Sequence, residues 1–170
     1  MTDIERTVSL IGMPGAGKST VGVLLAKQLG LGFSDTDLHI QAREERTLQD
    51  ILETEGYLRL RKIEEEVVMS VSLAGQVIAT GGSVVYSDNA MQRLRGAGRI
   101  VYLKAGLETL RERVARNPER GIASDSALSF EDIYAERTPK YERYADITVS
   151  AEQGSADSVA LSIKRFILEQ

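Results

Sequence analysis

The stretch Gly12-Met13-Pro14-Gly15-Ala16-Gly17-Lys18-Ser19 decides the fold, because it matches the pattern G-x-x-x-x-G-K-[ST] at every fixed position. The β-branched and apolar run 7–11, directly before it, predicts a short strand. Residues 19–29, directly after it, carry apolar side chains at helical spacing and predict a helix. The motif therefore lies in a turn from strand to helix, where this pattern binds phosphate.

The chemistry of phosphate binding explains these residue types. Glycines let consecutive backbone N–H groups turn inward around a phosphate oxygen, and the following helix adds the positive end of its dipole. Lys18 supplies a charge for the β- and γ-phosphates, and the Ser19 hydroxyl can ligate Mg²⁺. An ordinary glycine-rich turn is the alternative. The residues we expect at the nucleotide are Gly12, Pro14, Gly15, Ala16, Gly17, Lys18, Ser19 and Thr20.

Composition excludes several classes of protein. A chain of 170 residues, 42% of them hydrophobic, can bury one substantial core, so we expect a single domain over residues 1–170. The net charge of −4 argues against a general nucleic-acid binder, and the absence of cysteine excludes disulfides and thiolate chemistry. Residues 1–6 begin charged and no apolar run reaches membrane-spanning length, so we expect a cytoplasmic monomer without a membrane partner.

Short apolar runs alternate with longer helical patterns along the chain, which predicts an α/β fold with a parallel sheet. The segment 117–129 has weak periodicity and many small residues, and predicts a mobile loop. The expected strands are 7–11, 33–35, 76–79, 100–103 and 147–149. The expected helices are 19–29, 38–46, 48–55, 57–73, 89–94, 107–116, one that starts near 129, and 159–168.

Asp35-Thr36-Asp37 places two carboxylates one residue apart, just after the second expected strand. On an extended segment alternate side chains point the same way, so both carboxylates could face the phosphate loop. One could then hold the hydration shell of Mg²⁺ while the other orients or deprotonates an acceptor hydroxyl. The alternative is a turn in which the aspartates cap the next helix.

Other candidate groups are ambiguous when each is taken alone. The charges of Arg59-Leu60-Arg61-Lys62 and Glu64-Glu65-Glu66 alternate at helical spacing, which by itself favours a solvated helix face. Gly81-Gly82 follows a strand, where the missing side chains either admit a ligand to the backbone or make a turn. Further arginines stand around the expected loop and before a Thr-Pro pair, namely Arg113, Arg116, Arg120 and Arg137.

Together these features resemble the shikimate kinase family over residues 8–149. The motifs that carry the resemblance, in chain order, are 12–20, Asp35-Thr36-Asp37, Arg61-Lys62-Ile63-Glu64, Thr80-Gly81-Gly82, the loop around Arg120, and Arg137. The resemblance implies a three-layer α/β/α phosphate-loop kinase fold with a five-stranded parallel sheet. It also implies a mobile lid at about 117–129, an acceptor-binding helical part at about 38–73, and transfer of the γ-phosphoryl group of ATP to a hydroxyl of shikimate.

The resemblance assigns the nucleotide side of the site as follows. Lys18 and Ser19 handle the phosphates and Mg²⁺, with Asp35 behind the metal's water shell. Arg120 matches the lid arginine that reaches the transferring phosphate, and Arg113 matches the arginine near adenine. The cofactors implied are ATP and Mg²⁺.

The acceptor side is assigned in the same way. Asp37 matches the residue that binds acceptor hydroxyls and can act as base, and Arg61 and Arg137 match the pair that grips the substrate carboxylate, beside the Gly81 and Gly82 backbone. Two arginine forks can bind a carboxylate through paired charged hydrogen bonds. The implied catalytic residues are Lys18, Asp37 and Arg120.

The chain departs from the family pattern in the acceptor pocket. Gly81-Gly82-Ser83 stands where the family usually has three glycines, and Arg120-Gly121-Ile122 stands where the lid commonly reads Arg-Pro-Leu. Leu52 and Leu60 occupy two positions that typically carry aromatic rings. Such changes alter the shape of a pocket. The sequence therefore leaves the acceptor open.

We expect shikimate as the acceptor, with two alternatives. A smaller acceptor such as homoserine would suit the site physically, because Arg61 and Arg137 could hold its carboxylate and Asp37 its ammonium group. A nucleotide-binding regulatory module without transfer activity is the second alternative. Against a guanine-nucleotide switch, the chain has no N-K-x-D or T-K-x-D signature, and against a silent module Lys18, Asp37 and Arg120 are all present.

Overall fold

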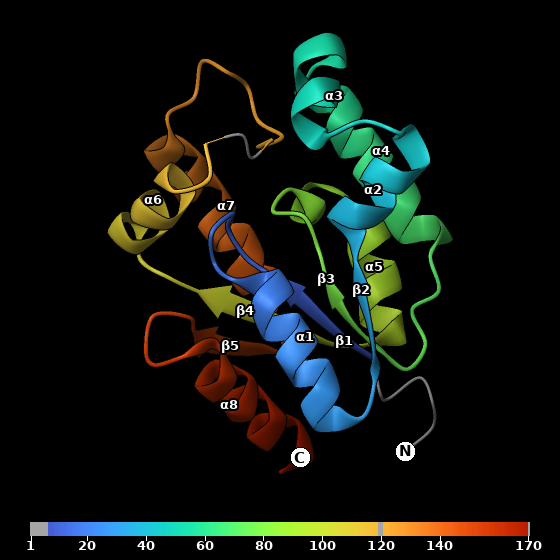
Figure 1. Ribbon diagram of the computed structural model, residues 1–170, viewed down its shortest axis with the longest axis vertical. Coiled ribbons are helices and arrows are strands. Elements are labelled where there is room, and N and C mark those ends of the chain that lie inside the picture. Colours follow the sequence, from blue (N-terminus) through green and yellow to red (C-terminus); the bar gives the residue numbers. More distant parts are fainter. Residues whose placement is uncertain (1–6, 119–120, 170) are drawn as a thin grey trace.

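A parallel β-sheet with the strand order β2-β3-β1-β4-β5 forms the centre of the molecule (Figure 1). The structure is a computed structural model, and it describes residues 7–118 and 121–169. The strands are β1 Thr7–Ile11, β2 Gly32–Asp35, β3 Gln76–Ala79, β4 Gly98–Lys104 and β5 Ile147–Ser150. All four strand pairings are parallel. The expectation of a five-stranded parallel sheet is confirmed for the part of the chain described.

Helices cover both faces of the sheet, which makes three layers. The helices are α1 Lys18–Leu29, α2 Thr36–Glu44, α3 Leu48–Glu55, α4 Tyr57–Ser70, the 3₁₀ helix η2 Val84–Tyr86, α5 Asp88–Ala97, α6 Leu107–Ala115, α7 Phe130–Tyr144 and α8 Ala156–Leu168. Helix α1 packs against α8 in front of the sheet in the view of Figure 1, and α5 and α7 lie behind it. No helix in the described ranges combines the length and the apolar character needed to cross a lipid bilayer.

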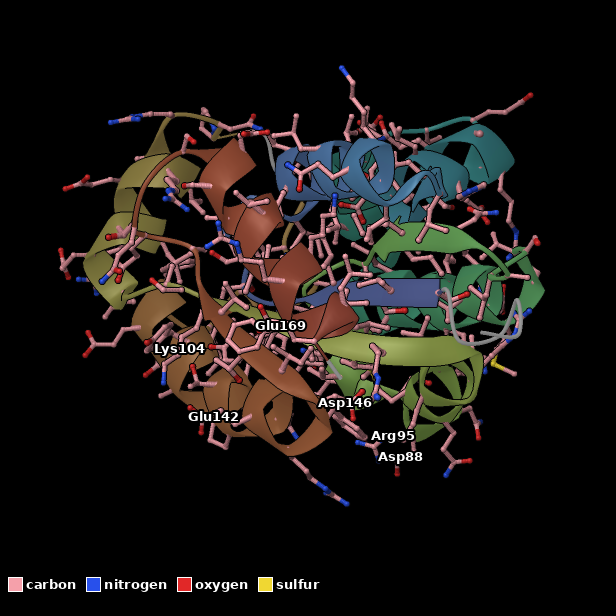
Figure 2. The ribbon with its side chains drawn as sticks, turned by 90° about the horizontal axis from the view of Figure 1, so that it is seen from below. Asp88, Arg95, Lys104, Glu142, Asp146 and Glu169 are labelled. Atoms are coloured by element: carbon pink, nitrogen blue, oxygen red, sulfur yellow. The ribbon has the colours of Figure 1, made fainter. Side chains whose placement is uncertain are left out.

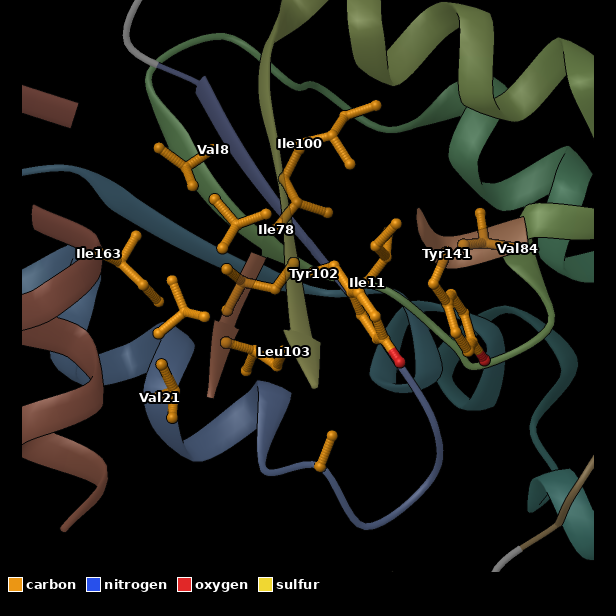
Figure 3. Close-up of a cluster of buried hydrophobic side chains, with 14 of the residues drawn as sticks. Val8, Ile11, Val21, Ile78, Val84, Ile100, Tyr102, Leu103, Tyr141 and Ile163 are labelled. Carbon is orange, nitrogen blue, oxygen red and sulfur yellow. The ribbon is translucent and has the colours of Figure 1, made fainter. Parts of the chain in front are cut away.

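The core lies on both sides of β1 and β4. Every residue of β1 is buried, and the central residues of β4 are buried as well. Strands covered on both faces need near-continuous apolar runs, which is the pattern that the sequence shows here. Figure 3 shows Tyr102 of β4 and Tyr141 of α7 among the aliphatic side chains, and their rings stack with centroids 5.2 Å apart.

A second, smaller hydrophobic cluster holds α2, α3 and α4 together beyond the carboxyl ends of the strands. Its buried side chains are Ile40, Ile51, Leu60, Ile63, Val67 and Ala123. Ala123 comes from the segment between α6 and α7, so this segment is attached to the helical part by the same apolar contacts. Several residues of this cluster, namely Ile40, Leu60 and Ala123, also line the pocket described below.

Two local features differ from the sequence prediction. Helix α2 begins at Thr36, so the aspartates do not lie together on an extended segment as expected. The reason is that the Asp35 side chain caps α2 by accepting a hydrogen bond from the backbone N–H of Asp37 at 2.9 Å. The short helix η2 after Ser83 was not predicted, because its three residues are apolar or aromatic and carry no capping signal.

Candidate active site

The phosphate loop occupies the turn between β1 and α1, as the motif predicts. Gly17 is the N-cap of α1 with φ of 90°, a conformation that favours glycine. A Cβ on Gly12 would lie 2.7 Å from the backbone oxygen of Leu103, so only glycine fits there. The Lys18 ammonium group donates to the carbonyl oxygens of Gly12 at 2.7 Å and Met13 at 2.9 Å. These contacts hold the lysine over the loop.

A pocket opens beside this loop, where the carboxyl ends of β1, β2 and β3 meet. The empty volume of the pocket is about 520 Å³ when the solvent at its open mouth is included. Open parallel sheets bind ligands at such an edge. Seven of the predicted site residues line it, namely Pro14, Lys18, Ser19, Asp37, Gly81, Gly82 and Arg137. Other predicted residues lie outside its lining, namely Gly12, Gly15, Ala16, Gly17, Thr20, Asp35, Arg61 and Arg113.

The two aspartates have different neighbours. Asp35 accepts a hydrogen bond from the Ser19 hydroxyl, with the oxygens 2.5 Å apart, while its other oxygen caps α2. Capping and proximity to the phosphate loop, which the sequence presented as alternatives, therefore occur together at Asp35. Asp37 lies in the first turn of α2 and lines the pocket with Lys18. Of the two aspartates, Asp37 is therefore the one that lines the pocket.

Arg113 lies at the outer side of the phosphate loop. Its guanidinium group donates to the backbone oxygen of Gly15 at 3.2 Å and to that of Ala151 at 2.9 Å. It thereby joins the loop to the segment after β5. Arg120, the other arginine assigned to the nucleotide, lies outside the described residues.

Arg61 and Arg137 converge on one oxygen atom. The Arg61 Nε donates to the carbonyl oxygen of Ala123 at 2.8 Å, and an Nη of Arg137 donates to the same oxygen at 3.0 Å. Arg137 is only 1% exposed, and no acceptor among the described residues reaches its Nε. No ion pair within 7–118 and 121–169 involves either arginine. Two adjacent cations, one fully buried, therefore lie beside the pocket without a carboxylate in ion-pair contact among the described residues.

Glu64 lines the same pocket and was missed as an individual site residue. It is 4% exposed, and the Ser83 hydroxyl donates to one carboxylate oxygen while the other has no donor among the described residues. Burial, with a smaller contribution from the charge of Asp37, raises the pKa of Glu64 to about 7. The hydrogen bond from Ser83 and the charges of Arg137 and Lys18 act on this pKa in the opposite direction. The charge pattern suggested a solvated face, but Glu64 follows the buried Leu60 by four residues, and that helical spacing places both on one face. The spacing was the signal that could have identified it.

Tyr86, in η2, is the second residue that sequence reasoning missed. Its ring centroid lies 3.8 Å from the guanidinium carbon of Arg61 and 5.5 Å from that of Arg137. No motif includes this position, and only the fold brings η2 next to the arginines of α4 and α7. Arg61 therefore lies in a second, adjoining cavity with Glu64 and Tyr86.

The two leucines at positions where the family resemblance implies aromatic rings occupy different environments. Leu60 is buried and lines the pocket beside Glu64, whereas Leu52 lines a separate surface hollow with Ile122. Of the two leucines, only Leu60 therefore borders the pocket directly.

The fold and this site together define a class of protein. A phosphate loop at a parallel-sheet edge, a pocket carboxylate and a pair of arginines are the parts of a phosphate-loop enzyme that transfers a phosphoryl group to a small acidic molecule.

The comparisons with known proteins give the family. The family model "Shikimate kinase" matches residues 14–168. The shikimate kinase of Pseudomonas savastanoi pv. phaseolicola is 37% identical over 161 residues, which cover 93% of this chain and 94% of that protein. The shikimate kinase of Pseudomonas aeruginosa is 39% identical over 147 residues, which cover 85% of this chain and 86% of that protein.

A solved structure agrees with these relatives. The shikimate kinase of Acinetobacter baumannii, in complex with shikimate, superposes with a TM-score of 0.89 at 32% identity, covering 97% of this chain and 94% of that one. The chain belongs to the shikimate kinase family.

Proposed function

We propose that this protein transfers the γ-phosphoryl group of ATP to a hydroxyl of shikimate. The observation that carries the proposal is the pair of converging arginines, which form no ion pair within the described residues, beside a pocket that also contains the phosphate-loop lysine. A buried guanidinium group needs a counter-charge, because removing it from water costs several kcal/mol (order of magnitude). A carboxylate-bearing acceptor supplies that charge.

The nucleotide side of the proposal rests on the loop and on Asp35. The hydrogen bonds to the loop carbonyl oxygens place the Lys18 ammonium group at the phosphate loop. From there, Lys18 can turn to the β- and γ-phosphates of ATP. Ser19 and Asp35 present adjacent oxygens, the atom type that Mg²⁺ prefers, so these residues fit the metal. When bound, Mg²⁺ neutralises charge on the transferring group. Arg113 keeps the loop in place for the nucleotide.

The acceptor side places the hydroxyl near Asp37. In this proposal Asp37 accepts a hydrogen bond from the acceptor hydroxyl and takes its proton during transfer. Arg137 and Arg61 bind the carboxylate, and the backbone of Gly81 and Gly82 borders the acceptor. Holding the acceptor at both ends fixes its hydroxyl in line with the γ-phosphate, which is the main contribution of such sites to rate.

We also propose a division of the chain into functional parts. Residues 38–73 form the acceptor-binding part and residues 117–129 form the lid of a single domain. Gly121, Ile122 and Ala123 line the pocket, and Ala123 also belongs to the hydrophobic cluster of α2, α3 and α4, which supports this division. A lid in this place excludes water and suppresses ATP hydrolysis.

The proposal is tested by ADP release from MgATP with shikimate, homoserine, gluconate or no acceptor, under one set of conditions. We expect strong stimulation by shikimate and none by gluconate. Equal ADP release with and without every acceptor would refute the assignment as a small-molecule kinase.

Homoserine remains a second candidate because of two features of the pocket. An aliphatic side chain, Leu60, lines it where the family resemblance implies an aromatic ring, and the carboxyl groups of Asp37 and Glu64 lie close enough that Asp37 raises the pKa of Glu64. Two neighbouring carboxyl groups suit an ammonium group, which shikimate lacks. Stimulation of ADP release by homoserine alone would select this candidate.

A further inference from the structure

The ring of Tyr86 has three cationic side chains around it. Its centroid lies 3.8 Å from the Arg61 guanidinium carbon, 5.5 Å from that of Arg137, and 5.3 Å from the ammonium nitrogen of Lys140. A cation within about 6 Å of an aromatic centroid is attracted by the ring's negative face. The shortest of these distances, to Arg61, is close enough for a guanidinium group to pack directly on the ring.

The two arginines need such a neutral partner because they repel one another. Burial lowers the pKa of Arg61, and the charge of Arg137 also lowers it. Both arginines nevertheless direct a donor to the same carbonyl oxygen of Ala123. Both guanidinium groups can bind one carboxylate without rearrangement only if they already lie side by side before the carboxylate arrives.

Tyr86 is itself fixed from both ends. Its backbone N–H donates to the carbonyl oxygen of Ser83 at 3.1 Å, which ties it to the turn that follows Gly82. Its hydroxyl donates to the carboxylate of Glu136, the residue before Arg137. The ring is therefore held between the glycine turn and helix α7, and cannot follow Arg61 if that side chain swings away.

We propose that Tyr86 is a positioning residue for the acceptor carboxylate: its ring holds Arg61 beside Arg137 so that both guanidinium groups meet one carboxylate. The inference rests on the proposed function, because it concerns the acceptor that those arginines bind. Tyr86 acts through the arginines, so its loss affects acceptor affinity and leaves the nucleotide side unchanged.

The test compares wild-type protein with Tyr86→Leu and Tyr86→Phe in steady-state assays of ADP release with shikimate. Tyr86→Leu should raise the KM for shikimate about tenfold, equivalent to about 1.4 kcal/mol, and leave the KM for ATP within about twofold. Tyr86→Phe keeps the ring and loses only the hydrogen bond to Glu136, so it should raise the KM for shikimate clearly less than Tyr86→Leu does. If Tyr86→Leu is not recovered folded, Tyr86→Met replaces it with the same expectations.

The matched control is Tyr144→Leu. Tyr144 also contacts two arginines, with Arg95 at 5.9 Å and Arg143 at 5.6 Å, and its hydroxyl also donates to a carboxylate, that of Asp88. Neither Tyr144 nor these partners line the pocket, and Figure 2 shows Asp88 and Arg95 close together at one edge of the molecule. Tyr144→Leu should leave both KM values unchanged. An equal rise in this control, or in the KM for ATP, would mean a general structural effect and overturn the proposal.

A second readout isolates the carboxylate. With the methyl ester of shikimate, which lacks the negative charge, wild type and Tyr86→Leu should have the same kcat/KM. An unchanged KM for shikimate in Tyr86→Leu, or an equal loss on the ester, contradicts the positioning role. If the wild-type protein is inactive on shikimate, the proposed function is contradicted instead. The same variants are then compared on homoserine, because its carboxylate would bind the same two arginines.

Discussion

Replacing Glu64 by glutamine should change how the stability of this protein depends on pH. Glu64 is buried against Ser83 and next to Gly81, where a Cβ on the glycine would lie 2.5 Å from a carboxylate oxygen. Burial raises the pKa of the carboxyl group from 4.5 to about 7. Glutamine has the same shape as the protonated acid and can accept the same hydrogen bond from Ser83, but it does not titrate.

The sign of the effect follows from proton binding. Between about pH 4.5 and pH 7 the folded chain holds a proton on Glu64 that the unfolded chain has lost, so the free energy of unfolding falls as pH rises through this window. Each unit of pKa difference corresponds to about 1.4 kcal/mol, which gives about 3 kcal/mol for the whole shift. Most of this, about 2 to 3 kcal/mol, should be lost between about pH 5 and about pH 8.5.

Urea unfolding of both proteins across this pH range measures the effect. We expect Glu64→Gln to gain about 2 to 3 kcal/mol relative to wild type from about pH 5 to about pH 8.5, with the change centred below pH 7. A difference between the two proteins that does not vary with pH would refute the reasoning, since Glu64 would then have an ordinary pKa in the folded chain.

The neighbouring residue Glu65 provides the control. Its hydrogen bonds from Lys62 and Ser87 lower its pKa. Its contribution to stability is therefore present above its ordinary pKa and lost as pH falls through the lowered value. Because the Glu65 side chain is partly exposed and its ion pair with Lys62 is screened by solvent, Glu65→Gln should differ only slightly from wild type, and any pH dependence should have the opposite sign to that of Glu64→Gln.

Further predictions concern the catalytic residues and the sheet. Lys18→Ala should reduce turnover with every acceptor by at least about 100-fold, and unchanged ADP release would remove the phosphate-loop argument. Asp37→Asn should abolish transfer while nucleotide binding, measured by calorimetry, is kept; retained activity would mean that the base lies elsewhere. Gly98→Ala should cost about 1–3 kcal/mol in urea unfolding, because its Cβ would lie 2.0 Å from the backbone oxygen of Thr7. Gly96→Ala, two residues earlier in open space on α5, should instead stabilise the protein by up to about 1 kcal/mol, and the same sign for both glycines would contradict this packing.

The sequence predicts most of this fold because its local signals agree with one another. The run 7–11, which is mostly β-branched or apolar, becomes the fully buried β1, and Leu48–Glu55 is bounded by the capping residue Thr47 and by Gly56. Such elements need no tertiary information, since their caps and periodicity specify both type and ends. The elements that differed, the start of α2 and the helix η2, depend on a single capping bond or on packing.

Site residues that belong to a short sequence motif could be predicted from the sequence. Site residues that reach the site only through tertiary packing could not. Lys18 and Asp37 were named from short motifs and lie at one pocket. Tyr86 could not be named, because its contacts join residues 25 and 51 positions away along the chain. Glu64 lay within a recognised motif, but its charge pattern suggested solvent exposure. Such residues are identified only when the fold brings distant elements together.

Identification of the phosphorylated product tests the central claim most directly. Protein, MgATP and equimolar shikimate and homoserine are incubated together, and the masses of the products are measured. We predict shikimate phosphate as the dominant product, formed in step with ADP. Homoserine phosphate as the main product, or ADP without any phosphorylated acceptor, would contradict the assignment of shikimate as the substrate.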